Sequence, residues 1–226
     1  MLRPAMSRIF FTYMSVYFIE KELYFPPVSE AEPDGLVAMG GDLSVERLLL
    51  AYKTGIFPWF EGDMPLWWSP DPRFVLFPEE LRVSHSMKQL LKQQSFRFSM
   101  NTAFDDVISQ CKSVARPGQR GTWITRDMKN AYTRLHKLGY AKSAEVWKED
   151  QLVGGLYGVQ IGKMFFGESM FSVVSNASKY AFINFVQELV KQQVHLIDCQ
   201  VYTPHLETFG ARMIPRKRFL EYLSNV

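Results

Sequence analysis

The sequence predicts an α+β fold whose larger, C-terminal part is built on a mainly antiparallel sheet. The first observation is a run of three strand-like segments between 141 and 170 that short turns join. The second is a long apolar helix, 176–192, which separates these segments from one more strand at 196–201. A proline- and tryptophan-rich stretch then marks a boundary, so we expect a small N-terminal domain at 1–73 and a larger domain at 74–226.

The N-terminal domain begins with residues 1–13, which we expect to be a ragged extension, because their apolar run is too short for a secretion signal. A short apolar run at 36–39 leads into a turn at 40–42, and the pattern that follows predicts a helix at 45–54, which Asp42 or Ser44 can cap. Three tryptophans then fall within ten residues, and the prolines among them exclude a regular helix. This stretch forms either a rigid packed loop or an aromatic platform for a base or an apolar side chain.

The second domain switches repeatedly between helical and strand-like periodicity. Strands are expected at 74–77, 96–100, 141–148, 152–160, 163–170 and 196–201. Helices are expected at 84–94, 102–111, 126–138, 176–192 and 215–223. Thr125 is the expected N-cap of the helix at 126–138, and Gly139 is expected to end it. Long connections between the hairpin-linked strands are absent from this pattern, which favours an antiparallel arrangement.

Composition indicates a folded protein of a reducing compartment. Hydrophobic residues make up 47% of the chain and aromatic residues 15%, which is typical of a well-packed core. Cys111 and Cys199 have neither a metal-binding nor a CxxC spacing, and Cys199 lies on the apolar face of its strand, so we expect a buried free thiol. No apolar run is long enough to span a bilayer. We therefore expect a cytoplasmic location and no membrane partner.

Several kinds of site lack their sequence signature. The four histidines are scattered without HxxxH or HExxH spacing, so no metal site is expected. Neither GxxxxGK[ST] nor GxGxxG occurs, which argues against an ATP or dinucleotide cofactor. Charge, in contrast, is strongly uneven: residues 82–142 hold 12 basic and 3 acidic residues, a net charge of +9. This segment either faces a polyanion such as nucleic acid or forms a solvated helical surface.

The strand at 196–201 carries the most suggestive pattern. Ile197 and Cys199 alternate with Asp198 and Gln200, so one face is apolar and the other places a carboxylate beside a carboxamide. This polar face is either solvated or a site in which Asp198 orients Gln200 toward a substrate. Glu168 stands in an apolar context, and a carboxylate there either pairs with an internal Arg or Lys or receives a cationic group of a substrate.

Six strings of the sequence closely resemble the bacterial leucyl/phenylalanyl-tRNA–protein transferase family. They occur in order and at the family spacing, between about residues 24 and 223, and together they are highly specific. The strings are GGDL at 40–43, GIFPW at 55–59, WWSPDPR at 67–73, GTWIT at 121–125, FGESMFS at 166–172 and LIDCQ at 196–200.

The resemblance implies an aminoacyltransferase with an acetyltransferase-like (GNAT-type) domain after the small N-terminal one. Such an enzyme moves leucine or phenylalanine from Leu-tRNA or Phe-tRNA to the α-amino group of proteins that begin with Lys or Arg, which marks them for degradation. Residues 173–178 lack the glycine-rich pyrophosphate loop of GNAT enzymes, which agrees with a tRNA donor. A coenzyme A–dependent acetyltransferase and a non-catalytic tRNA-binding module are the alternatives.

The resemblance also implies roles for individual residues. Gln200 would accept a hydrogen bond from the incoming amine, Asp198 would hold and polarise Gln200, and Glu168 would lie beside the cationic acceptor. The remaining expectations fall into three groups: Leu156, Phe165, Gly167 and Ile197 as a pocket for the leucyl or phenylalanyl side chain, Trp68 and Trp123 against the terminal adenosine, and Lys88, Lys92 and Arg97 on the tRNA acceptor stem. The turn after the strand departs from the family pattern, so a side-chain contact there would be missing or made by Thr203.

Overall fold

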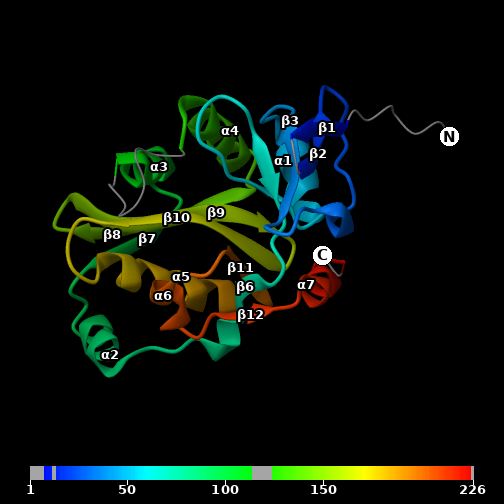
Figure 1. Cartoon of the computed structure of the whole chain (residues 1–226). Coiled ribbons are helices and arrows are strands. Elements are labelled where there is room, and N and C mark those ends of the chain that lie inside the picture. Colours follow the sequence, from blue (N-terminus) through cyan, green and yellow to red (C-terminus); the bar gives the residue numbers. More distant parts are fainter. Residues whose placement is uncertain (1–7, 12–13, 114–123, 225–226) are drawn as a thin grey trace. The chain divides into compact units, whose positions relative to one another are not determined.

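The computed structural model describes residues 8–11, 14–113 and 124–224 (Figure 1). These residues form two compact units. The first contains the chain up to Arg73 together with the C-terminal segment from Ile214, and the second contains Phe74–Met213. The two domains expected from the sequence, 1–73 and 74–226, stay a prediction. They differ from these units in one respect: the sequence prediction put the C-terminal segment in the second domain, whereas it belongs to the first unit.

The first unit is built on a five-stranded sheet. Its strands, in spatial order, are β1 (Arg8–Phe11), β2 (Met14–Ile19), β3 (Leu36–Gly40), β5 (Leu66–Trp68) and β4 (Phe57–Pro58). Residues 1–13 are therefore not simply the ragged extension we expected, because β1 lies within them and pairs with β2. The helices of this unit are η1 (Val28–Glu30), α1 (Val45–Lys53) and α7 (Arg216–Leu223), and the Ser44 side chain caps α1 as one of the two expected alternatives.

The tryptophan-rich stretch contributes strands to this sheet. Trp67 has no exposed surface, and its indole N–H donates to the Gly40 carbonyl at 2.9 Å. Arg73 is also fully buried, and its guanidinium lies 4.7 Å from the ring centroids of both Phe57 and Phe219. These contacts favour the rigid packed alternative for Trp67, since burial leaves no ring face for a ligand.

The second unit is organised around a seven-stranded mixed sheet, and it confirms the predicted α+β class. The strand order is β12 (Arg212–Ile214), β6 (Arg73–Leu76), β11 (Leu196–Gln200), β10 (Met164–Ser172), β9 (Gln151–Ile161), β8 (Ala141–Lys148) and β7 (Arg97–Met100). The pairs β7–β8, β8–β9, β9–β10 and β6–β11 are antiparallel, whereas β10 and β11 are parallel. The parallel pair is possible because a helix connects its two strands.

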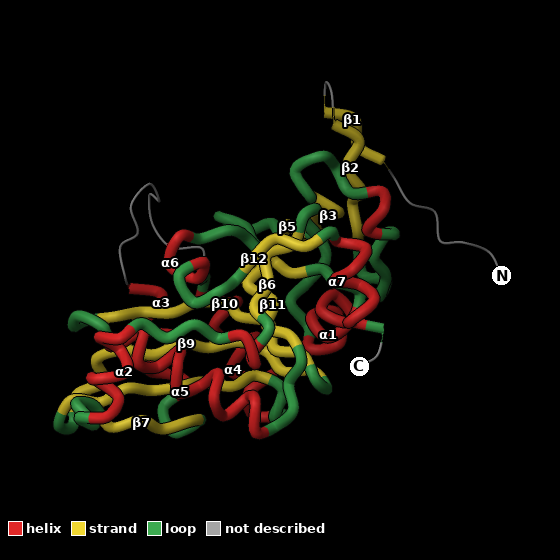
Figure 2. The backbone as a smooth tube through the Cα atoms, turned by 90° about the horizontal axis from the view of Figure 1, so that it is seen from below, coloured by secondary structure: helices red, strands yellow, loops and turns green. Residues whose placement is uncertain are grey.

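Helices cover both faces of this sheet (Figure 1). One face carries α3 (Phe104–Ser113) and α4 (Arg126–Lys137), and the other carries α2 (His85–Lys92) and α5 (Ala177–Lys191). Figure 2 views the second of these faces from below. The short helices η2 (Pro78–Glu80) and α6 (Pro204–Glu207) complete the unit. Thr125 caps α4 as predicted, because its hydroxyl accepts from the Met128 N–H.

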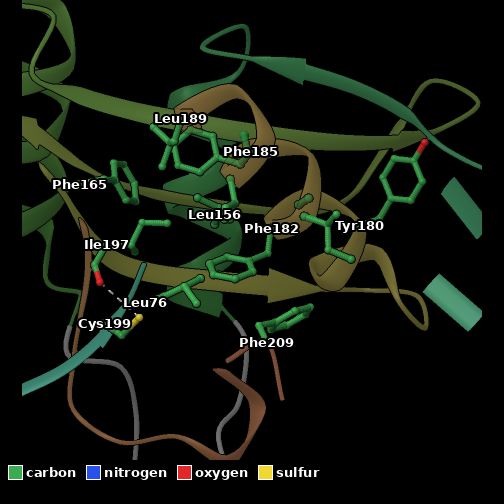
Figure 3. Close-up of a cluster of buried hydrophobic side chains, with 14 of the residues drawn as sticks. Leu76, Leu156, Phe165, Tyr180, Phe182, Phe185, Leu189, Ile197, Cys199 and Phe209 are labelled. Atoms are coloured by element: carbon green, nitrogen blue, oxygen red, sulfur yellow. Dashed lines mark hydrogen bonds between the residues drawn. The ribbon is translucent and has the colours of Figure 1, made fainter. Parts of the chain in front are cut away.

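The main apolar cluster lies between the sheet and α5 (Figure 3). Cys199 belongs to this cluster with Leu76 and Ile197 and is 9% exposed, so the predicted buried thiol is confirmed. Burial raises the pKa of its thiol, and the nearby Asp198 charge raises it further. The thiolate, which is the reactive form, is therefore strongly disfavoured near neutral pH.

A helix that spans a membrane must meet requirements of both length and hydropathy. None of the described helices is both long enough and apolar enough to cross a bilayer.

Candidate active site

The three residues expected to act in catalysis meet where β10 and β11 stop pairing. The parallel pairing joins Met164–Phe166 to Leu196–Asp198 and goes no further. Beyond it, β10 continues to Ser172, whereas β11 ends at Gln200. Glu168 and Gln200 therefore lie just past the last paired residues, on two strands that no longer bond to each other in the ladder.

Each strand carries a bulge at this position. Opposite β9, Gly167 pairs with Gly158 and Ser169 with Tyr157, so Glu168 is an extra residue in β10. Opposite β6, the register of β11 shifts between Asp198 and Gln200. A bulge turns a side chain away from the direction that strict alternation gives it. The two bulges bring the Gln200 carboxamide to the Glu168 carboxylate, with 3.0 Å between Nε2 of Gln200 and Oε1 of Glu168.

Asp198 acts on the backbone of Gln200. Gln200 has a φ of 65°, in the left-handed region that costs a side-chain-bearing residue free energy. Its backbone N–H donates to Oδ1 of Asp198 at 2.8 Å, which stabilises this conformation. The structure thus shows Asp198 holding Gln200 through its backbone, while the Gln200 side chain bonds to Glu168, and the polarising role expected of Asp198 stays a prediction. Asp198 has no exposed surface, so the alternative of a solvated polar strand face is wrong.

Glu168 is a bridge between α4 and β11. Its Oε2 accepts the phenolic hydrogen of Tyr132 at 2.8 Å, and its Oε1 accepts the Gln200 amide. An ionised carboxylate can only accept, so the group of Gln200 that faces it is the NH₂. The Gln200 oxygen consequently points away from Glu168, and a hydrogen-bond acceptor is presented beside a negative charge that is partly open to solvent.

The four residues expected to form an apolar pocket differ in their surroundings. Leu156, Phe165 and Ile197 are 3%, 2% and 2% exposed and belong to the cluster beneath α5 (Figure 3). Phe165 packs edge-on against Phe185 of α5, with ring centroids 4.7 Å apart. A leucyl or phenylalanyl side chain would have to displace such packing, so the lining role of these three residues stays a prediction.

Gly167 is the exception among the pocket candidates. A Cβ at this position would meet only the Asp198 carbonyl oxygen, at 3.6 Å, whereas a Cβ at Gly158 would lie 2.1 Å from the Phe166 carbonyl oxygen. Gly158 is therefore required by packing. At Gly167, in contrast, a Cβ would make only an ordinary van der Waals contact among the described residues, so packing there does not require glycine.

The structure describes the surroundings of four of the five residues expected to bind adenosine and tRNA. Trp68 belongs to the first unit, where it is half-buried and donates from its indole to the Trp59 carbonyl. Trp123 lies outside the described residues. Lys88 and Lys92 are exposed one turn apart on α2, and Arg97 is exposed on β7 with its guanidinium 4.9 Å from the centroid of a Trp147 ring. Their binding roles stay predictions.

Two further residues of the second unit, Thr203 and Tyr132, make hydrogen bonds that bear on the predicted site. The Thr203 hydroxyl accepts from the Leu206 N–H, so it caps α6 directly after the turn that departs from the family pattern. Tyr132 was missed by the sequence analysis, although it stands among Met128, Ala131 and Leu135 on the buried side of α4. A buried tyrosine generally needs a hydrogen-bond partner, and this signal pointed to a polar group beneath α4. Among the described residues, no group of three or more His, Cys, Asp or Glu side chains could hold a metal ion.

Comparison with known proteins shows that the sequence matches one family. A family model described as leucyl/phenylalanyl-tRNA protein transferase matches residues 75–224, and the model of its N-terminal domain matches 41–71. Proteins named leucyl/phenylalanyl-tRNA–protein transferase are similar over most of their length. The one from Flavobacterium johnsoniae is 54% identical, covering 93% of this chain and 100% of that protein. The one from Syntrophus aciditrophicus is 55% identical, covering 91% and 87%.

Solved structures are more distant. The structure of L-PGS from Bacillus licheniformis has a TM-score of 0.41 and 10% identity, and the similarity covers 71% of this chain and 54% of that chain. The GNAT-type origin of the second domain is therefore left as a prediction from the sequence.

Proposed function

Because the chain belongs to the leucyl/phenylalanyl-tRNA–protein transferase family, we propose that its acceptors are proteins with an N-terminal Lys or Arg and that Gln200 orients their α-amine. The chain is an aminoacyltransferase that moves leucine or phenylalanine from aminoacyl-tRNA to protein. The observation that supports the proposed site is the Gln200–Glu168 hydrogen bond, since it leaves the Gln200 oxygen directed away from the carboxylate.

The reaction depends more on positioning the amine and the ester than on activating either of them. The amine nitrogen attacks the carbonyl carbon of the aminoacyl ester, an amide bond forms, and the bond to the ribose oxygen breaks. The ester is already activated, and an α-amine with a pKa of ~7.7–8.0 is partly neutral near neutral pH. Holding amine and ester together can supply ~7–11 kcal/mol of the barrier.

Gln200 would orient the amine without acting as its base. A carboxamide oxygen is a very weak base, so it accepts a hydrogen bond from the amine while the nitrogen lone pair points at the ester. The proton released by the amine then passes to the leaving ribose oxygen or to water. Asp198 holds the Gln200 backbone in the conformation that allows this.

Acceptor choice is assigned to Glu168. Its carboxylate lies at the bulge in the middle of β10, where the strand is partly exposed, next to Gly167. A negative charge there attracts the cationic side chain of an N-terminal Lys or Arg and disfavours an acidic one. The lengthened product would carry a leucine or phenylalanine at its N-terminus, which marks it for degradation in the cytoplasm.

Labelled leucine transfer to synthetic peptides tests this proposal. Peptides that differ only in their first residue should be labelled when it is Lys or Arg, and at least ~10-fold more slowly when it is Ala or Glu, because the charge interaction with Glu168 is lost or reversed. Acetylation of the peptide N-terminus is the control and should abolish labelling. Equal rates for Lys- and Glu-initiated peptides would refute the assigned acceptor, and a chain that only bound tRNA would label no peptide.

The donor is proposed to bind through exposed basic residues and aromatic rings. Lys88, Lys92 and Arg97 would contact phosphates of the acceptor stem, which gives affinity without sequence preference. Trp68 and Trp123 would stack against the terminal adenosine, and the leucyl or phenylalanyl group would enter beside Gly167, toward Leu156, Phe165 and Ile197.

Removing two of these positive charges should weaken tRNA binding and leave the transfer step itself unchanged. The double substitution Lys88→Ala and Lys92→Ala is expected to raise KM for Leu-tRNA ~10-fold and to leave kcat within twofold. The slope of log KM against log salt should fall by about 1 for each phosphate that the variant no longer neutralises. Lys137→Ala, on the helix of the opposite sheet face, is the control and should change neither quantity. An unchanged salt slope in the double variant would place the tRNA elsewhere.

A further inference from the structure

The hydroxyl of Tyr132 is a buried polar group to which the reaction described so far gives no role. Tyr132 has no exposed surface, and its ring packs edge-on against Tyr157, with centroids 5.5 Å apart. Its O–H donates to Oε2 of Glu168 at 2.8 Å. A buried phenol that donates to the carboxylate at the bulge of β10 fixes where that carboxylate lies.

The orientation of the Gln200 carboxamide depends on this carboxylate. Oε1 of Glu168 accepts from Nε2 of Gln200 at 3.0 Å, while Oε2 is held by Tyr132. A carboxamide can turn over by half a rotation at little cost in volume, which exchanges its donor and acceptor ends. Only the turned-out oxygen can accept from an incoming amine, and the turned-in NH₂ is enforced by an ionised Glu168 that stays in place.

We propose that Tyr132 is a positioning residue for aminoacyl transfer, which holds Glu168 so that the Gln200 oxygen faces the acceptor amine. The inference rests on the proposed role of Gln200. Tyr132 touches neither donor nor acceptor in this account, and its effect passes entirely through Glu168. The hydrogen-bond chain joins α4 to β10 and β11, so three elements far apart in the sequence determine one amide orientation.

The substitution Tyr132→Phe tests this role, because it removes the hydroxyl and keeps the packed ring. We expect kcat for leucine transfer to a Lys-initiated peptide to fall 10- to 100-fold, which is the effect of losing one hydrogen bond to a charged group. KM for Leu-tRNA should stay within twofold, since no tRNA-binding residue is altered. Tyr180→Phe is the matched control: Tyr180 is a buried tyrosine of α5, on the other face of the sheet, and its substitution should leave kcat unchanged.

A double-mutant cycle distinguishes positioning from a general structural effect. Glu168→Gln can offer an amide to Gln200 and lets both carboxamides turn, so it should also lower kcat. If Tyr132 acts only through Glu168, Tyr132→Phe in the Glu168→Gln background should lower kcat by less than twofold more. The proposal would be overturned if the effects of the two substitutions on kcat multiplied in the double variant, or if Tyr132→Phe alone kept full kcat. A wild-type chain that labels no peptide would instead refute the proposed function itself.

Discussion

Replacing Gln200 by alanine is expected to lower kcat for leucine transfer by about 10²–10³-fold, with KM for Leu-tRNA nearly unchanged. This is the range for loss of one preorganised polar contact to the reacting atoms. The reason is that, in the proposed mechanism, the Gln200 oxygen contacts the amine only in the reacting complex, whereas tRNA is proposed to bind through phosphate contacts with other residues. Single-turnover transfer of labelled leucine to a Lys-initiated peptide measures the effect.

The left-handed backbone of Gln200 requires a second substitution as a control. Alanine at a φ of 65° is strained, so part of its effect could come from the backbone. Gln200→Gly also removes the carboxamide but accepts this φ without cost. The two variants should lose transfer to the same extent. A glycine variant that retains more than about a tenth of the wild-type rate would assign the loss to the backbone and remove Gln200 from the chemistry.

Asp198 is expected to respond differently to asparagine and alanine. Asparagine retains an oxygen that can accept the Gln200 N–H, so Asp198→Asn should keep kcat within ~10-fold of wild type. Alanine leaves this N–H without its acceptor, which we expect to lower kcat ~10²-fold and the free energy of unfolding by ~1–3 kcal/mol. The measurements are kcat and urea unfolding of both variants.

Comparing the asparagine and alanine substitutions of Asp198 distinguishes support through a hydrogen bond from support through charge. If the carboxylate supported Gln200 through its charge, asparagine and alanine would reduce transfer alike, because both remove the charge. Asp198→Glu provides a further comparison, since it keeps the charge and moves the accepting oxygen away from the Gln200 N–H. Full transfer in the glutamate variant together with loss in the asparagine variant would contradict the positioning role that the 2.8 Å hydrogen bond indicates.

The regular elements of the second unit could be predicted because their periodicity is local. The expected bounds of the helix at 126–138 and the strand at 141–148 agree with α4 and β8 to within one residue. The strands β4 and β12 were missed because two or three residues carry no measurable period. The alternation rule correctly placed Cys199 in the apolar core, since that residue obeys the period of two.

The site was harder to predict because it depends on departures from regular structure. A period of two put Asp198 and Gln200 on one face of the strand, but it could not show the register shift between them or the positive φ of Gln200. Glu168 likewise takes its direction from a bulge. Its partner Tyr132 comes from a helix 36 residues earlier, and no local pattern specifies such a long-range hydrogen bond. The resemblance pointed to Asp198, Gln200 and Glu168, which the structure brings together, and their catalytic roles stay predictions.

The central claim is that the Gln200 oxygen receives the acceptor amine where β10 and β11 diverge. It is tested most directly by a crystal structure of the chain with a Lys-initiated peptide and leucyl-adenosine in which an amide replaces the ester. We predict that the peptide's α-amine nitrogen lies about 3 Å from Oε1 of Gln200, while Nε2 still donates to Glu168. An amine nitrogen more than about 5 Å from this oxygen would contradict the account.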